Sequence, residues 1–68
     1  MVIIRISEHI GVLRKQKGIT QKELAEELGV TTQAVSKWEN ARGCPDIQLL
    51  PDIAKIFDVS IDELFGYV

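Results

Sequence analysis

Two apolar patterns between residues 20 and 40, in the stretch TQKELAEELGVTTQAVSKWEN, constrain the fold more than any other part of the chain. Leu24 and Leu28 stand four residues apart, and Val35 and Trp38 stand three apart. Both spacings place the paired side chains on the same face of a helix. Only a few residues separate the two pairs, so we predict two short helices joined by a tight turn.

The boundaries of both helices are also marked in the sequence. Thr20, with Glu23 three residues later, has the spacing of a capping box, and Thr31 can cap the second helix with its hydroxyl group. Gly29 follows the first helix and readily takes the positive φ that a sharp turn requires. We therefore expect a helix-turn-helix unit over about residues 20–40.

Apolar spacing in the flanking sequence predicts three further helices and no sheet. Ile6, Ile10 and Leu13 recur at i, i+4 and i+7, which predicts a first helix that Gly18 ends. The same kind of spacing over residues 50–57 predicts a fourth helix. The expected fold class is therefore all-α, with five helices.

The start of the fourth helix and the burial of the fifth are less sharply specified. The fourth helix is expected to begin near Asp46, but Pro51 would remove a hydrogen bond from a helix interior. Therefore either the first turn of this helix is bent, or the helix begins later than Asp46. Ser60 and Glu63 form a second capping box, which opens a short last helix. The apolar residues that this helix can bury are Val59, Ile61 or Leu64.

This order of elements resembles the Cro and phage-repressor type of helix-turn-helix family, also called the xenobiotic-response-element type of transcriptional regulator. The segment IGVLRKQKGITQKELA resembles the family's first helix and the start of its second. The segment WENARGCPDIQLLPDIAKIFDVSIDELFG resembles its loop and last two helices. The resemblance implies a compact five-helix bundle like the DNA-binding domain of lambda repressor, as a single domain over residues 1–68.

Charge is distributed unevenly along the chain. The formal net charge is -2 and the pI is about 5.2, although DNA-binding domains are often basic. Residues 14–42 carry six basic and four acidic side chains, whereas residues 43–68 carry one basic and five acidic. We therefore expect a positive face and a negative back.

Composition narrows the class of protein further. With 68 residues there is room for one modest core. No apolar run approaches the about 20 residues of a membrane span, and MVIIRI lacks the length and cleavage site of a signal peptide. A lone Cys44 fits a reducing compartment. We expect a cytoplasmic protein with no membrane segment.

The predicted second helix of the helix-turn-helix unit, which begins after Thr31 and is called the recognition helix below, has one polar face. At 100° per residue, its packing residues Val35 and Trp38 lie opposite a polar set. Glutamine can pair with adenine, serine and threonine with several base edges, and lysine with guanine or a phosphate. A merely solvated helix face would carry the same residue types, and the family resemblance favours DNA. The residues expected to contact base edges are Thr32, Gln33, Ser36 and Lys37.

Phosphate contacts are expected at the margins of this helix. Gln21 lies in the first turn of the preceding helix, where free N–H groups and the helix dipole favour an anion. The resemblance implies that this glutamine contacts DNA, and that Asn40 and Arg42, after the recognition helix, touch the sugar-phosphate backbone. Lys22 and Lys17 either add positive charge there or only keep the surface solvated.

Catalysis and metal binding find no support in the sequence. His9 and Cys44 have no orienting partner at a recognisable spacing, and one Cys with one His falls short of a zinc site. We expect no enzyme activity, no metal and no cofactor.

Two functions remain. The first is a sequence-specific transcriptional regulator, a repressor that binds a palindromic operator in double-stranded DNA as a homodimer. The alternative is a protein-interaction module, such as the antitoxin component of a toxin–antitoxin pair.

An ion pair between two helices and an interface between two copies of the chain are also predicted. Related repressors pair an Arg and a Glu between the first and third helices, and the matching residues are Arg14 and Glu39. We expect them to form a partly buried bidentate ion pair. The dimer is expected to form through the apolar C-terminal end, Phe65, Tyr67 and Val68, or through a strand at residues 2–4.

Overall fold

The structure is a computed structural model that describes residues 6–64, and in this range the chain forms helices and no strand. A short 3-10 helix precedes the fourth α-helix. The elements in chain order are α1 (Ile6–Lys17), α2 (Gln21–Leu28), α3 (Thr32–Glu39), η1 (Ile47–Leu49), α4 (Leu50–Phe57) and α5 (Ile61–Leu64). The predicted all-α class with five α-helices is confirmed.

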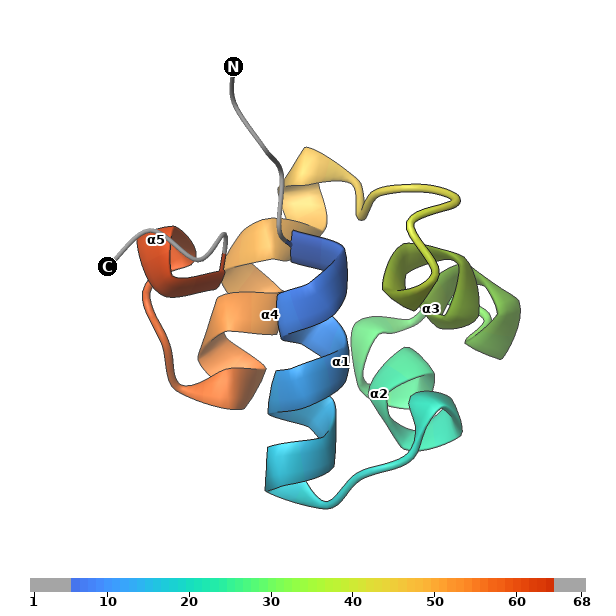
Figure 1. Cartoon of the computed structure of the whole chain (residues 1–68), viewed down its shortest axis with the longest axis horizontal. Coiled ribbons are helices and arrows are strands. Elements are labelled where there is room, and N and C mark those ends of the chain that lie inside the picture. Colours follow the sequence, from blue (N-terminus) through green and yellow to red (C-terminus); the bar gives the residue numbers. More distant parts are fainter. Residues whose placement is uncertain (1–5, 65–68) are drawn as a thin grey trace.

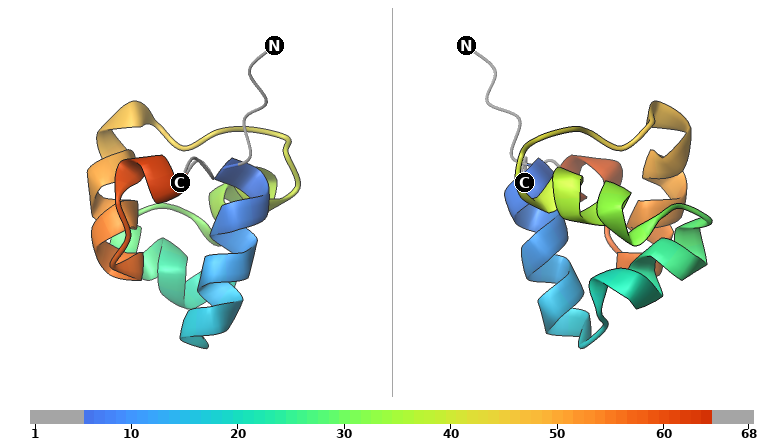
Figure 2. Two further views of the ribbon diagram at one scale, coloured as in Figure 1. Left: turned by 60° about the vertical axis from the view of Figure 1, so that its left-hand side comes forward. Right: turned by 90° about the vertical axis from the view of Figure 1, so that its right-hand side faces the viewer.

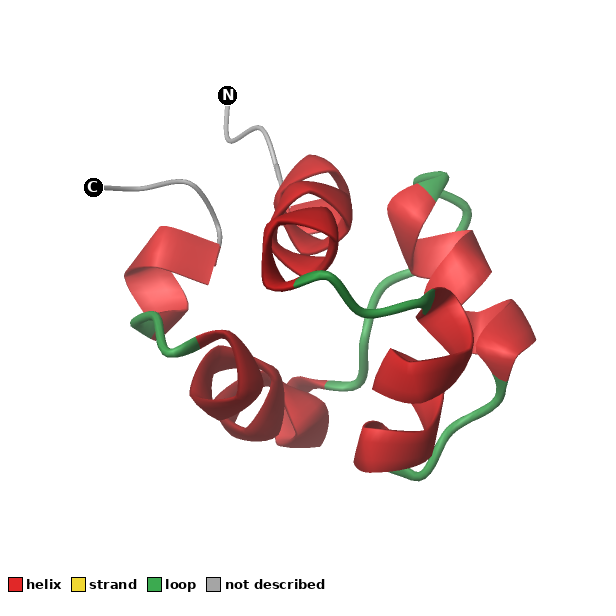
Figure 3. Ribbon diagram, turned by 90° about the horizontal axis from the view of Figure 1, so that it is seen from below, coloured by secondary structure: helices red, strands yellow, loops and turns green. Residues whose placement is uncertain are grey.

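The long helix α1 separates the domain into two halves. On one side of it lie α2 and α3, and on the other lie α4 and α5 (Figures 1 and 3). α3 packs against both α2 and α1, while α4 and α5 pack against each other and against α1. The right-hand view of Figure 2 looks onto α3, which crosses the outside of the domain beside α1. One face of α3 is therefore free of the core.

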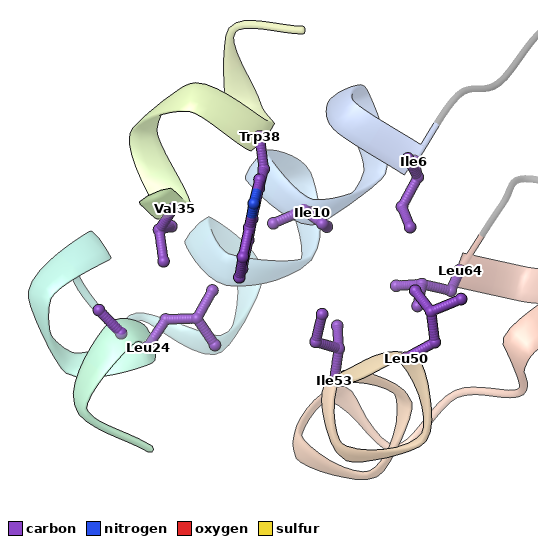
Figure 4. Packing of buried hydrophobic residues seen from close by; sticks show 9 residues of the cluster. Ile6, Ile10, Leu24, Val35, Trp38, Leu50, Ile53 and Leu64 are labelled. Atoms are coloured by element: carbon purple, nitrogen blue, oxygen red, sulfur yellow. The ribbon is translucent and has the colours of Figure 1, made fainter. Parts of the chain in front are cut away.

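Each α-helix contributes to a single hydrophobic core. The largest fully buried side chains come one from each helix, in chain order Ile10, Leu24, Val35, Ile53 and Leu64. Figure 4 shows these side chains converging together with the Trp38 ring, which points from α3 into the cluster. The burial of apolar area is the main favourable term in folding, so this cluster holds α3 in place.

The predicted helix starts are present. The Thr20 hydroxyl accepts from the Glu23 N–H at 3.0 Å, and the Glu23 carboxylate accepts from the Thr20 N–H at 2.9 Å. Thr31 accepts from the N–H of Ala34 at 3.1 Å through its hydroxyl oxygen, and so caps α3. These bonds satisfy N–H groups that a helix N-terminus leaves without an intrahelical partner.

The fifth helix also begins as predicted. Ser60 and Glu63 form the second reciprocal capping box, with both bonds at 3.0 Å. Of the three apolar residues that this helix could bury, Leu64 is fully buried, Val59 is partly buried and Ile61 remains 42% exposed. The question that the sequence left open is therefore decided in favour of Leu64.

The first four α-helices end in the same hydrogen-bonded turn, in which one residue takes the left-handed conformation. Gly18 and Gly29 have φ values of 77° and 72°, as expected for glycine at a helix end. Ala41 and Asp58 take this role after α3 and α4, with φ values of 59° and 55°. Neither turn was predicted, because a non-glycine residue takes positive φ only rarely, and residue type alone does not show where it will do so.

The fourth α-helix begins later than Asp46. The Asp46 side chain instead accepts from the N–H of Gln48 at 3.3 Å and caps the 3-10 helix η1. Leu50 then begins α4, and Pro51 lies in its first turn. Proline is tolerated there because the N–H that it lacks would have no partner inside the helix. Of the two alternatives for Pro51, the later start is correct.

Two glycine-to-alanine substitutions should change stability in opposite directions. A Cβ at Gly11 would lie 3.6 Å from the Glu39 carboxylate oxygen, an ordinary contact, and alanine favours a helix interior over glycine. Gly11→Ala should therefore raise the free energy of unfolding by about 0.5 to 1 kcal/mol. Gly18→Ala meets no neighbour but is strained at positive φ, so it should lower that free energy by about 1 kcal/mol. Urea unfolding of both variants measures the two effects, and shifts of the same sign would contradict this account.

Candidate nucleic-acid interface

The outer face of α3 carries the polar side chains that the sequence singled out. Thr32, Gln33 and Lys37 are exposed, and Ser36 between them is partly buried. On the opposite side of the helix Val35 is fully buried. The helix thus has a packing side and a polar side that faces away from the core.

Asn40 is turned back onto the helix that it follows. Its amide nitrogen donates to the backbone oxygen of Ser36 at 2.9 Å and reaches the Ser36 hydroxyl oxygen at 3.4 Å. Both contacts are made by the same amide nitrogen, Nδ2. A phosphate offers only acceptor oxygens, so Asn40 can donate to one only through this nitrogen, which already donates to Ser36.

Arg42 is placed by the turn that ends α3. Its N–H donates to the Lys37 carbonyl at 2.8 Å, while Ala41 takes the left-handed conformation. Apolar residues that pack against the core occupy the equivalent position after α1, α2 and α4, namely Ile19, Val30 and Val59. Arg42 is exposed instead. The usual apolar contact of this turn is thus replaced by a cation next to the polar face of α3.

The predicted ion pair between α1 and α3 is confirmed. The Arg14 Nε donates to Glu39 Oε2 at 2.7 Å, and Nη2 donates to Glu39 Oε1 at 3.1 Å, a bidentate arrangement. The two side chains are 13% and 11% exposed. A third nitrogen of Arg14, Nη1, donates to the carbonyl of Ile19 at 2.9 Å. Arg14 is therefore engaged inside the domain and is not part of the positive surface.

Gln21 joins this ion pair from α2. Its side-chain nitrogen donates to Glu39 Oε1 at 3.1 Å. The three side chains thus connect the first three α-helices. This bond was not predicted from the sequence. Gln21 and Glu39 are 18 residues apart, and residue type alone does not indicate the direction of the Gln21 amide. Lys22, the next residue, is exposed.

The comparison with known sequences decides the family. A helix-turn-helix family profile matches residues 10–64. The chain belongs to the helix-turn-helix family, in its Cro and phage-repressor type.

Named relatives of this family are transcriptional regulators. The chain is 44% identical over 63 residues to the transcriptional activator BcrR of Enterococcus faecalis, covering 93% of this chain and 31% of that protein. It is 35% identical over 63 residues to the cryptic phage CTXphi transcriptional repressor RstR of Vibrio cholerae, covering 93% and 56%. The chain thus spans about a third and about half of the length of these relatives.

Solved structures of the family have the same fold. A transcriptional regulator from Listeria innocua matches with a TM-score of 0.86 and 38% identity, over 93% of this chain and 59% of that chain. The P22 c2 repressor protein in complex with a synthetic operator matches with a TM-score of 0.84 and 30% identity. That match covers 93% of this chain and 96% of the repressor chain. The expected lambda-repressor-like bundle is therefore confirmed.

The Arg14–Glu39 pair also affects the protonation of Glu39. Burial by itself raises the pKa of Glu39, but hydrogen bonds from Arg14 and Gln21 and the charges of Arg14 and Lys15 lower it, and the net pKa lies below the ordinary value of 4.5. The hydrogen bond that Arg14 donates to Glu39 raises the pKa of Arg14 in turn. Both groups are therefore charged at neutral pH.

This lowered pKa predicts how stability depends on pH. A carboxyl group whose pKa falls on folding stabilises the folded state fully above its unfolded pKa, and the contribution is lost as the pH falls through the folded value. The difference in free energy of unfolding between the wild type and Glu39→Gln should therefore be largest above about pH 5 and shrink on acidification. Urea titrations between pH 7 and pH 3 measure this difference, and a constant difference would contradict the prediction.

Other site types have less support in the described part of the chain. His9 lies on α1 and is partly buried, whereas Cys44 is exposed in the loop after α3. Across residues 6–64, no group of three or more His, Cys, Asp or Glu side chains is arranged to hold a metal ion. None of the helices described is long and apolar enough to cross a membrane.

Proposed function

We propose that the chain binds operator DNA sequence-specifically through α3 and thereby regulates transcription, with repression by occlusion of a promoter as the expected mode. The observation that carries this proposal is the exposed polar face of α3 on a fold that matches an operator-bound repressor over 93% of the chain. We further propose that the protein has no enzyme activity and acts in the cytoplasm, together with its DNA. The antitoxin-like alternative explains the polar face less directly.

The proposed base contacts lie on the exposed face of α3. An α-helix fits the major groove, where each base pair presents its own pattern of donors and acceptors. Gln33 can bind adenine through two hydrogen bonds, and Lys37 can reach guanine O6 and N7. Thr32 and Ser36 supply shorter hydroxyl groups for base edges or a thymine methyl group. These four residues are the proposed readers of sequence.

The proposed phosphate contacts flank this helix. Gln21 begins α2, and Arg42 follows the turn after α3 with its side chain exposed. Lys22 is exposed next to Gln21 and adds positive charge. Asn40, which follows α3, is also proposed to touch the sugar-phosphate backbone; its amide nitrogen donates to the carbonyl of Ser36.

We also propose that two copies bind a palindromic operator. The segments expected to form the dimer, Phe65, Tyr67 and Val68 or residues 2–4, lie outside the described residues. Two recognition helices that enter successive major grooves would place the half-sites about 34 Å apart on one face of the duplex. A palindrome recovered by selection from random duplexes would support the dimer.

Substitutions at Gln33 and Arg42 should separate specificity from affinity. Gln33→Ala should weaken binding to the selected site by about 1 to 3 kcal/mol and relax the preference at particular base pairs. Arg42→Ala should weaken all duplexes similarly and reduce the slope of log K against log salt by about one. Fluorescence anisotropy with selected and scrambled duplexes at several salt concentrations measures both effects.

Lys55→Ala is the matched control, since Lys55 is an exposed cation on α4, away from α3. It should leave both affinity and salt slope near the wild-type values. Equal, weak binding of selected and random duplexes, unaffected by Gln33→Ala, would remove the regulator proposal and favour the protein-interaction alternative.

A further inference from the structure

The Glu39 carboxylate connects the first three α-helices and holds Gln21, a residue at the proposed DNA surface. The two oxygens of Glu39 accept three hydrogen bonds, two from Arg14 at 2.7 and 3.1 Å and one from the Gln21 amide at 3.1 Å. Gln21 is the first residue of α2 and is partly exposed, whereas the Glu39 side chain is only 11% exposed. A surface amide is thus anchored on an interior charge.

This anchor restricts the conformation of the Gln21 side chain. A primary amide is planar and carries two hydrogens on its nitrogen and one acceptor oxygen. When one hydrogen is held by Glu39, the direction of the second hydrogen is set by the plane of the amide. A free glutamine on a helix surface has several rotamers, and restricting it to one of them on binding costs conformational entropy. Glu39 removes part of that cost before a ligand arrives.

Arg14 makes the carboxylate compatible with a nearby phosphate. An ionised glutamate without a partner would repel the DNA backbone. The bidentate contact with Arg14 neutralises this charge, and the Gln21 amide bonds to the oxygen that would otherwise accept from Arg14 alone. The Gln21 amide is therefore a neutral N–H donor, and the carboxylate that holds it has its charge neutralised by Arg14.

We infer that Glu39 is a positioning residue for phosphate binding: it holds the Gln21 amide so that its second N–H can donate to a phosphate oxygen of the duplex. This inference rests on the proposed function. It gives the Arg14–Glu39 pair a role in binding in addition to its role in the fold.

A double-mutant cycle tests the inference. Gln21→Ala should weaken binding of the selected duplex about tenfold or more, as loss of one hydrogen bond to a charged group predicts. Glu39→Gln leaves one acceptor oxygen for three donors, so it should release Gln21 and weaken binding by a similar factor. The double variant should bind no more weakly than Gln21→Ala alone, because both changes remove the same contact.

Two further readouts distinguish positioning from a merely structural role. Gln21→Ala should leave the salt slope unchanged, since a neutral amide releases no counterion, whereas Arg42→Ala should reduce it by about one. In the isotope-labelled wild type, the side-chain NH2 signals of Gln21 should shift when the duplex is added. Affinities are compared at a temperature where circular dichroism shows that each variant is folded. The NMR measurement uses the wild type alone, so it does not depend on the folding of any variant.

The outcomes separate this inference from the function on which it rests. If Glu39→Gln weakens binding by the same factor with and without Gln21, Glu39 acts only on the fold, and the inference is overturned. It is also overturned if Gln21→Ala has no effect on affinity, while a loss with Gln33→Ala would leave the proposed function standing. Absence of selective binding by the wild type would remove both.

Discussion

Replacing Glu39 with alanine should lower the free energy of unfolding by about 3 kcal/mol, the low end of the range for breaking a buried ion pair. The Arg14 side chain, which is only 13% exposed in the wild type, loses its carboxylate partner, and Gln21 loses its acceptor. Because Glu39 is the last residue of α3, the recognition helix loses a connection to both α1 and α2. Urea unfolding followed by circular dichroism measures the change.

Glu26→Ala is the matched control for this variant. Glu26 is an exposed glutamate on α2, and it should change stability by no more than about 0.5 kcal/mol. Similar losses for the two variants would mean that the ion pair contributes little to the folded state.

Replacing Trp38 with alanine should be at least as costly, with a loss of about 3 to 5 kcal/mol. Trp38 is 6% exposed, and its indole ring lies in the core cluster between α3 and its neighbours (Figure 4). Its removal loses a large apolar area and leaves a cavity that the helices can close only in part. Since small domains have only about 5 to 15 kcal/mol of stability, much of this variant should be unfolded at 37 °C. Thermal unfolding measures the loss.

Val12→Ala and Trp38→Phe complete this experiment. Val12 lies on α1 but is 52% exposed, so its truncation should cost less than about 0.5 kcal/mol. Trp38→Phe retains an aromatic ring in the core and should lose less than Trp38→Ala. If Trp38→Ala instead unfolds like the wild type but loses DNA binding, the side chain contacts bases and does not stabilise the core.

The predicted helix boundaries that proved correct depend on short-range chemistry. The capping boxes at Thr20 and Ser60 join residues three positions apart, and the left-handed turns at Gly18 and Gly29 follow from the missing Cβ. Such contacts form within one turn of chain, so residue type and spacing suffice to predict them. The ion pair between Arg14 and Glu39 was also predicted: helical spacing placed both residues at the edge of a buried face, and the family resemblance indicated that they pair.

The candidate site was predicted only in part. The polar face of α3 follows from helical periodicity, which also placed Trp38 on the packing side. The directions of individual amides do not follow from it, and the structure turns Asn40 toward Ser36 and Gln21 toward Glu39. A glutamine or asparagine has several rotamers at any surface position, and a partner brought close by the fold selects among them.

The sequence by itself thus determined the helices, most of their ends and the face of α3 that packs, because these depend on residues within a few positions of one another. Only the tertiary structure decided the late start of α4, the left-handed Ala41 that places Arg42, and the contact of Gln21 with Glu39. Each of these depends on where separate helices meet when they bury one core. That packing offsets the backbone strain at Ala41 and brings together side chains that are distant along the chain.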